Sequence, residues 1–122
     1  MPPQNDFPIV FEQLKNILQP YARNLTITAD TSKGYSLDGP YSEKWKKVIF
    51  FGSAQTKKNY VSFYLMPVYM FPELLNGISP ELKKHMQGKS CFNFKKVEPE
   101  LFEELSELTR KGVERFREDL GQ

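Results

Sequence analysis

Two apolar stretches separated by a polar loop, KKVIFFGS at residues 46–53 and NYVSFYLM at residues 59–66, decide the fold. Both are rich in the β-branched and aromatic residues that favour strands, and the loop at 54–58 is short enough for a hairpin. Apolar side chains occupy both faces of both predicted strands, which a sheet with one solvated face would not show. We therefore expect helices to cover one face, while the other face needs a second cover.

The second face of this hairpin is the first candidate functional surface. Uninterrupted alternation along the two strands places Ile49 and Phe51 on the same face as Tyr60 and Tyr64. Aromatic residues make up 14% of the chain, more than a small core needs. The face therefore predicts a site for a small apolar ligand or a homodimer interface, and the alternative is that helices cover both faces of one monomer. The predicted ligand or interface residues are Tyr35, Trp45, Ile49, Phe51, Tyr60 and Tyr64.

Helix and strand signals recur on both sides of the hairpin. Before the hairpin we expect a helix at 8–19 and a half-buried strand at 25–30, paired with a strand at 35–38 that ends at Asp38-Gly39-Pro40. After it we expect a short helix that begins at Pro72 and another that begins at Pro80, with Ser79 as the N-cap of the latter. A fifth strand at 90–95 and a long helix at 99–119 follow. Short connections between strands favour antiparallel pairing. The sequence thus predicts a single α+β domain over residues 1–122, with about five mostly antiparallel strands, an N-terminal helix and C-terminal helices.

Composition places the chain among ordinary single-domain proteins. It has 122 residues, with 17 Lys and Arg against 15 Asp and Glu, so the formal net charge is +2. This charge is too small to indicate a nucleic-acid partner. The apolar runs are too short to span a bilayer, and the start MPPQNDFPIV has no secretory pattern. The single cysteine excludes an internal disulfide, so we expect a cytoplasmic protein with no membrane partner.

A row of carboxylates on the predicted C-terminal helix is the second candidate site. At helical spacing, Glu100, Glu103, Glu104 and Glu107 share one face. Oxygen ligands of this kind hold hard cations, so an iron-binding chaperone is the alternative function, with iron as a cofactor that the main hypothesis does not need. In the competing interpretation this face is solvated, its acids stabilise the helix dipole, and Glu107 pairs with Lys111.

Signatures of catalysis are weak. His85 is the only histidine, and Cys91 has no activating neighbour in sequence. We therefore expect a non-enzymatic binding domain and assign no catalytic residues. An enzyme of unknown reaction is the second alternative, which a deep pocket holding His85 or Cys91 beside a carboxylate would favour.

Two lysine clusters lie between residues 44 and 58 and between residues 83 and 96. Lysines of this kind suit solubility and the protection of sheet edges. Together with the interleaved aromatic residues they could instead hold phosphates or an acidic partner. Whether the two clusters form one patch depends on the tertiary structure.

Four segments resemble a known family in content and order. They are GPYSEKWKK (39–47), KKNYVSFYLMPVYMFPELL (57–75), SPELKKHMQGKSCFNFKK (79–96) and LFEELSELTRKGVERFRE (101–118). Together they resemble the YdhG-like family, domain of unknown function 1801, over most of the chain from about Gly34 onward. The resemblance implies a small α+β domain with an antiparallel sheet flanked by helices, and a bacterial cytosolic protein. Some relatives are described as frataxin-like iron chaperones, and the family supplies no catalytic residues to carry over.

Overall fold

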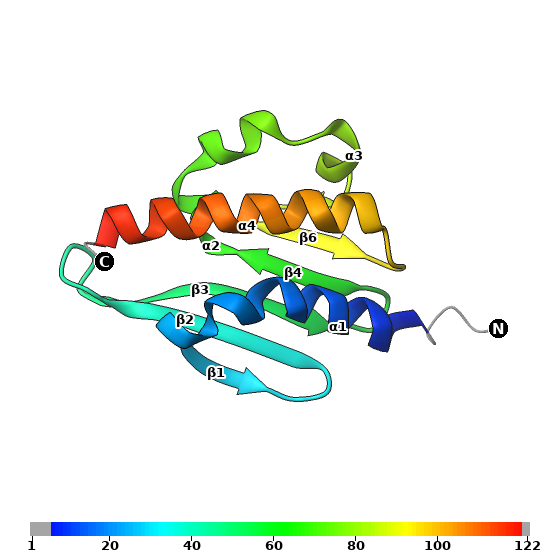
Figure 1. Ribbon diagram of the computed structural model, residues 1–122, viewed down its shortest axis with the longest axis horizontal. Coiled ribbons are helices and arrows are strands. Elements are labelled where there is room, and N and C mark those ends of the chain that lie inside the picture. Colours follow the sequence, from blue (N-terminus) through cyan, green and yellow to red (C-terminus); the bar gives the residue numbers. More distant parts are fainter. Residues whose placement is uncertain (1–5, 121–122) are drawn as a thin grey trace.

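Within residues 6–120, a computed structural model of the chain shows a six-stranded antiparallel sheet with two long helices on one face (Figure 1). The strands are β1 (Thr26–Asp30), β2 (Gly34–Ser42), β3 (Lys47–Thr56), β4 (Val61–Leu65), β5 (Met86–Gln87) and β6 (Cys91–Phe94), in the order β1-β2-β3-β4-β6-β5. The helices are α1 (Phe7–Leu18), η2 (Gln19–Asn24), α2 (Met66–Met70), η3 (Pro72–Gly77), α3 (Pro80–Lys83) and α4 (Pro99–Leu120). The predicted α+β fold is confirmed. The additional strand, β5, has two residues and is too short to show a strand period in sequence.

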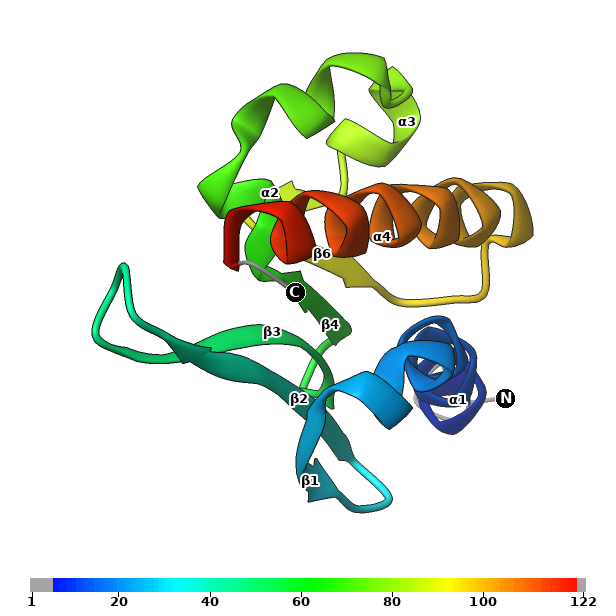
Figure 2. The ribbon, with the colours of Figure 1, turned by 60° about the vertical axis from the view of Figure 1, so that its left-hand side comes forward.

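The helices α1 and α4 pack side by side against the sheet, and the core lies between the two layers (Figure 2). Leu14 and Leu18 of α1 are fully buried, as is Phe63 of β4. At one end of α4 the ring of Phe102 meets that of Phe94 edge-on, with 4.9 Å between centroids. A single layer of helices therefore covers one face of the sheet.

Proline, serine and glycine residues mark the helix starts and the tight turn that their chemistry favours. Pro8 lies in the first turn of α1, where its missing N–H removes no helical hydrogen bond. Ser79 caps α3, because its Oγ accepts a hydrogen bond from the backbone N–H of Leu82 at 3.1 Å. Gly88 has a φ of 80°, which suits the tight connection between β5 and β6. The predicted hairpin of β1 and β2 is also present.

Two expectations for the first hairpin are wrong. The strand β1 is an outer strand with no buried residue, and the side chain of Ile27 is 47% exposed. The short helix η2, which directly precedes β1, contacts the strand but does not bury its side chains, so its alternating pattern does not indicate burial. The strand β2 does not end at Asp38-Gly39-Pro40 but continues to Ser42, because a shift in register accommodates these residues.

A β-bulge in β3 reverses the alternation on which the face assignment depends. Leu37 pairs with Gly52 and Asp38 pairs with Phe50, so Phe51 is an extra residue in β3. A bulge lets two consecutive residues project to the same side of the sheet. A Cβ on Gly52 would lie 3.3 Å from Leu18 of α1, and Phe51 packs against α4. Both residues therefore face the helices, and Phe50 projects to the opposite face.

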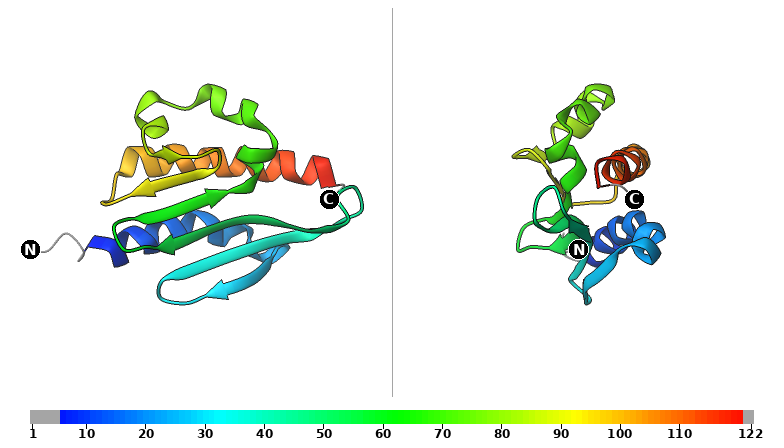
Figure 3. Two further views of the ribbon diagram at one scale, coloured as in Figure 1. Left: turned by 180° about the vertical axis from the view of Figure 1, so that it is seen from behind. Right: turned by 90° about the vertical axis from the view of Figure 1, so that its left-hand side faces the viewer.

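The opposite face of the sheet, which we call the open face, is not covered by α1 or α4, and among the described helices only α2 borders it at one end (Figure 3). Its central residues follow from the register, since Ser53 pairs with Tyr64, Tyr64 with Cys91, and Ser62 with Asn93. These residues alternate with the buried Phe63 and therefore point away from the helices. The open face has an apolar end near α2 and a polar end near the start of β4.

Candidate ligand-binding site

The structure does not bring the six predicted aromatic-face residues together. Phe51 is fully buried against α4, and Tyr35 is buried beneath Lys15 of α1, with 5.3 Å from Nζ to the ring centroid. Tyr64 belongs to the open face instead, and Tyr60 lines a hollow at the end of that face. The prediction that Phe51 shares a face with Tyr60 and Tyr64 assumed unbroken alternation along β3. It is wrong, because the bulge at Phe51 changes which residues of β3 point to which face.

Trp45 and Ile49 are associated with a hollow at the apolar end of the open face. We call this hollow the apolar groove. It has a volume of about 320 Å³, within the range of small-molecule sites. Its lining comes from the β2–β3 turn, from β3 and from α2, and consists of Trp45, Lys47, Val48, Ile49, Phe50, Met66, Tyr69 and Met70.

Exposure of apolar side chains is concentrated at this groove. Among the described residues, six large apolar side chains are exposed, and Trp45 (49%), Val48 (51%) and Tyr69 (54%) line the groove. A fourth, Tyr41, pairs with Val48 across the sheet. A continuous exposed patch of this kind marks a binding surface more often than isolated apolar residues do. The flexible thioethers of the two methionines suit a surface that adapts to its occupant.

The charges around the groove are mainly positive. Lys47 lines it, and the Nζ of Lys89 lies 6.0 Å from the ring centroid of Tyr69. Neither lysine, nor the neighbouring Lys46, forms an ion pair with a residue of the described chain. Lys44 is different, because its Nζ lies 3.0 Å from Asp119 of α4. An anionic group on a bound molecule would therefore meet unpaired cations at this rim.

Hydrogen bonds between side chains link β4 and β6 in the middle of the open face. The Oδ1 of Asn93 accepts from the Oγ of Ser62 at 2.7 Å and from the Sγ of Cys91 at 3.3 Å. Burial raises the pKa of the Cys91 thiol above its ordinary value, so the thiol is protonated at neutral pH. Burial likewise raises the pKa of Tyr64. This region therefore offers no activated nucleophile.

A second hollow, which we call the histidine hollow, lies at the polar end of the open face. Its volume is about 430 Å³, and its lining consists of Tyr60, His85, Asn93, Lys95, Lys96 and Glu98. The imidazole of His85 stacks on the ring of Phe94, with 4.5 Å between centroids. It therefore holds a fixed orientation beside the carboxylate of Glu98, an arrangement the sequence did not predict, because 13 positions separate the two residues along the chain.

Both ring nitrogens of His85 are occupied. Nδ1 lies 2.7 Å from the backbone oxygen of Asn93, and Nε2 lies 3.0 Å from Oε2 of Glu98. A carbonyl oxygen and a carboxylate oxygen are hydrogen-bond acceptors, so each ring nitrogen faces an acceptor within the fold. A general base needs a ring nitrogen with a free lone pair. The pocket with a carboxylate beside His85 exists, but its hydrogen bonds do not favour an acid–base enzyme.

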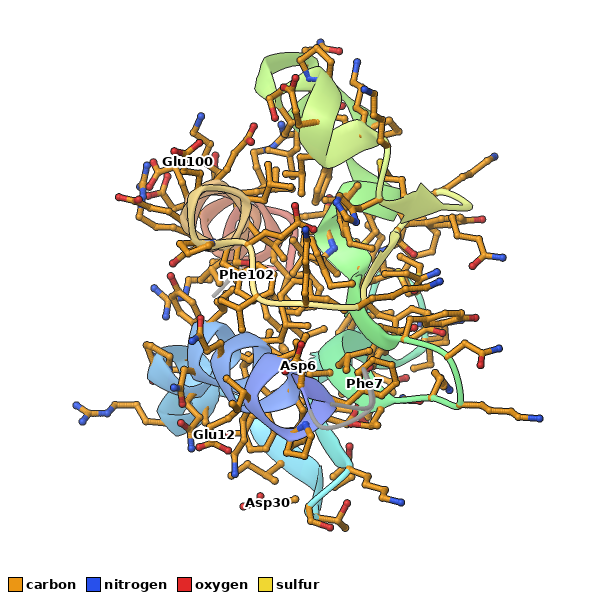
Figure 4. The ribbon with its side chains drawn as sticks, turned by 90° about the vertical axis from the view of Figure 1, so that its right-hand side faces the viewer. Asp6, Phe7, Glu12, Asp30, Glu100 and Phe102 are labelled. Atoms are coloured by element: carbon orange, nitrogen blue, oxygen red, sulfur yellow. The ribbon has the colours of Figure 1, made fainter. Side chains whose placement is uncertain are left out.

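The carboxylate row on α4 is divided among different partners. The Oε1 of Glu104 accepts from the Oγ of Ser79 at 2.7 Å, and Oε2 accepts from the backbone N–H of the same residue. Glu107 binds Arg110 rather than the predicted Lys111, and this hydrogen bond lowers the pKa of the Glu107 carboxyl. Figure 4 shows Glu100 on the outer side of α4, while Phe102 is directed inward. Within residues 6–120, no three His, Cys, Asp or Glu side chains lie close enough to share a metal ion.

Comparisons of the chain with protein-family models, curated proteins and solved structures yielded no match. No helix among the described residues combines the length and the apolar character needed to cross a bilayer. Sequence reasoning missed the contribution of Met66, Tyr69 and Met70 to the groove, because these residues were assigned to the end of a strand and the segment after it. The helical signal at Pro67 would have indicated α2, since proline favours the first turn of a helix.

Proposed function

We propose that this protein is a non-enzymatic binding domain whose apolar groove takes a small molecule with an apolar body and an anionic group. The observation that carries the proposal is the space of about 320 Å³ shared by the apolar side chains of Trp45, Met66 and Tyr69. Burial of apolar surface supplies affinity for the body of such a molecule. Lys46 and Lys47 supply cations for its anionic group.

The only tryptophan of the chain makes the proposal directly measurable, because Trp45 lines the groove. We expect decanoate to change the Trp45 emission in a saturable manner. The variant Tyr69→Ser should weaken this binding about tenfold, since it removes buried apolar contact. Ile27→Ser is the matched control, because Ile27 is similarly exposed but lies on the outer strand β1. Equal weakening by both variants, or no saturable change, would contradict the proposal.

The anionic part of the proposal has its own test. Decanol has the same chain as decanoate without the charge, so the double variant K46Q/K47Q should weaken decanoate binding and leave decanol binding unchanged. Equal effects on the two ligands would remove the lysines from recognition. A homodimer is the competing occupant of the groove, and light scattering distinguishes it. A dimeric mass for the wild-type chain that becomes monomeric in Tyr69→Ser would replace the small ligand with a second copy.

An iron-binding chaperone is the alternative function, as the resemblance to the YdhG-like family implies. The groups that support it are the exposed carboxylates of Glu100 and Glu103, while Glu104 and Glu107 already have partners. Anaerobic titration with ferrous iron tests it. Saturable binding that is lost in E100Q/E103Q would favour the iron role, and equal weak binding by both proteins would leave the groove as the better-supported site.

A further inference from the structure

We propose that the histidine hollow binds the phosphate group of a small phosphorylated molecule, at a site separate from the apolar groove. The hollow has a volume of about 430 Å³, enough for a phosphate and the organic group attached to it. Each of its lining residues carries a polar or charged group, among them Tyr60, His85, Lys95, Lys96 and Glu98, although carbon atoms make up most of the lining surface. The proposal does not depend on the function assigned to the groove.

The charges in the hollow favour an anion. Both ring nitrogens of His85 face acceptors, which are the backbone oxygen of Asn93 and the carboxylate of Glu98. Lys95 and Lys96 are exposed and form no ion pair with any residue of the described chain. The one carboxylate of the lining, Glu98, is already bound to His85. Two lysine ammonium groups against one engaged carboxylate match an anion better than a metal ion.

Lysines of the cluster between residues 44 and 58 reach the same end of the sheet as Lys95 and Lys96. Val61 pairs with Phe94, so the loop that carries Lys57 and Lys58 comes next to the end of β6. The Nζ of Lys57 donates to Oε1 of Gln55 at 2.8 Å, which holds its ammonium group over the open face. The two lysine clusters therefore approach one another here. The positive field extends beyond the hollow and would attract an anion toward it.

Hydrogen-bond donors of a suitable kind accompany this charge. Tyr60 is a lining residue, and a tyrosine hydroxyl group can donate to a phosphate oxygen. The 22-residue helix α4 begins at Pro99, directly after Glu98, so its N-terminal end adds to the positive potential. Phosphate oxygens accept several charge-assisted hydrogen bonds at once. The lining residues thus include several groups that can donate to a phosphate.

The single histidine of the chain allows an unambiguous test. With ¹⁵N-histidine labelling, every imidazole signal in the spectrum belongs to His85. We expect inorganic phosphate, and more strongly pyrophosphate, to shift these signals in a saturable manner at constant ionic strength set with potassium chloride. The double variant K95Q/K96Q should weaken pyrophosphate binding about tenfold. K46Q/K47Q removes the same charge from consecutive lysines at the other end of the open face, and should leave the binding unchanged.

A second variant gives an effect of opposite sign. Glu98→Gln removes the negative charge nearest the site, so pyrophosphate binding should become several-fold tighter, whereas Glu103→Gln on the exposed side of α4 should not change it. Weaker binding in Glu98→Gln, equal losses in the two lysine variants, or the absence of a saturable shift would overturn the proposal. A shift produced by a single-stranded oligonucleotide but not by pyrophosphate would also overturn it, since the partner would then be a polynucleotide.

Discussion

The ring of Phe51 meets the ring of Phe116 edge-on, with 5.3 Å between the centroids and an angle of 75° between the planes. This contact ties β3 to the C-terminal part of α4. Its neighbour Phe50 lines the apolar groove on the other side of the sheet. Of these two consecutive phenylalanines, Phe51 therefore belongs to the core and Phe50 to the candidate site, and the bulge in β3 determines this assignment.

Truncation of these two phenylalanines should have unequal effects on stability. Phe51 is fully buried, so Phe51→Ala should lower the free energy of unfolding by about 3–5 kcal/mol. Phe50 is only half-buried, so Phe50→Ala should cost less than about 2 kcal/mol. Urea denaturation measures both values. A larger loss for Phe50→Ala than for Phe51→Ala would refute the assignment of the two faces.

The bulge leaves no room for a side chain at Gly52. A Cβ there would lie 2.9 Å from the backbone oxygen of Tyr64 and 3.3 Å from Leu18. Gly52→Ala should therefore destabilise the protein by about 1–3 kcal/mol through overpacking. Gly77→Ala is the matched control, because a Cβ at Gly77 has no atom within 4 Å. Thermal unfolding of both variants tests the difference, and similar melting temperatures would contradict the close packing described.

Glu104 fastens α4 to the start of α3. Its carboxylate accepts two hydrogen bonds from Ser79, so Glu104→Ala should lower the free energy of unfolding by about 1.5–3 kcal/mol. Glu103→Ala, next to it on the exposed face, should stay within about 0.5 kcal/mol of the wild type. Equal stability of the two variants in chemical denaturation would show that the Ser79 contact does not matter and would return Glu104 to the metal-site hypothesis.

The reactivity of Cys91 should shift with pH in a defined direction. Burial raises the pKa of its thiol, and the thiolate is the species that alkylating agents attack. The rate of alkylation by iodoacetamide in the folded protein should therefore rise at a higher pH than it does for a free cysteine, and it should be slow at neutral pH. The urea-unfolded chain is the control. A folded-state rate that already reaches its plateau near neutral pH would indicate an activated thiol instead.

Much of the fold was predictable because short-range sequence patterns specify the individual helices and strands. The apolar stripe of α4 follows the 3.6-residue period. Pro8 in the first turn of α1 and Ser79 as the N-cap of α3 mark helix starts, and the strands around Phe63 are rich in β-branched and aromatic residues. The exposure of Ile27 was not predictable, since burial of an outer strand depends on which helix covers it. The short strand β5 has no pattern of its own and forms only because β6 lies beside it.

The sequence predicted the membership of the candidate sites less well than it predicted the fold. The amino-acid sequence by itself determined the α+β class, the order of most elements and the presence of surplus aromatic surface. Only the tertiary structure decided that Phe51 belongs to the core and Phe50 to the groove, and that His85 meets Glu98 across 13 positions of chain. The physical reason is that secondary structure follows from short-range periodicity, whereas the phase of a strand beyond a bulge and the meeting of distant side chains follow from packing.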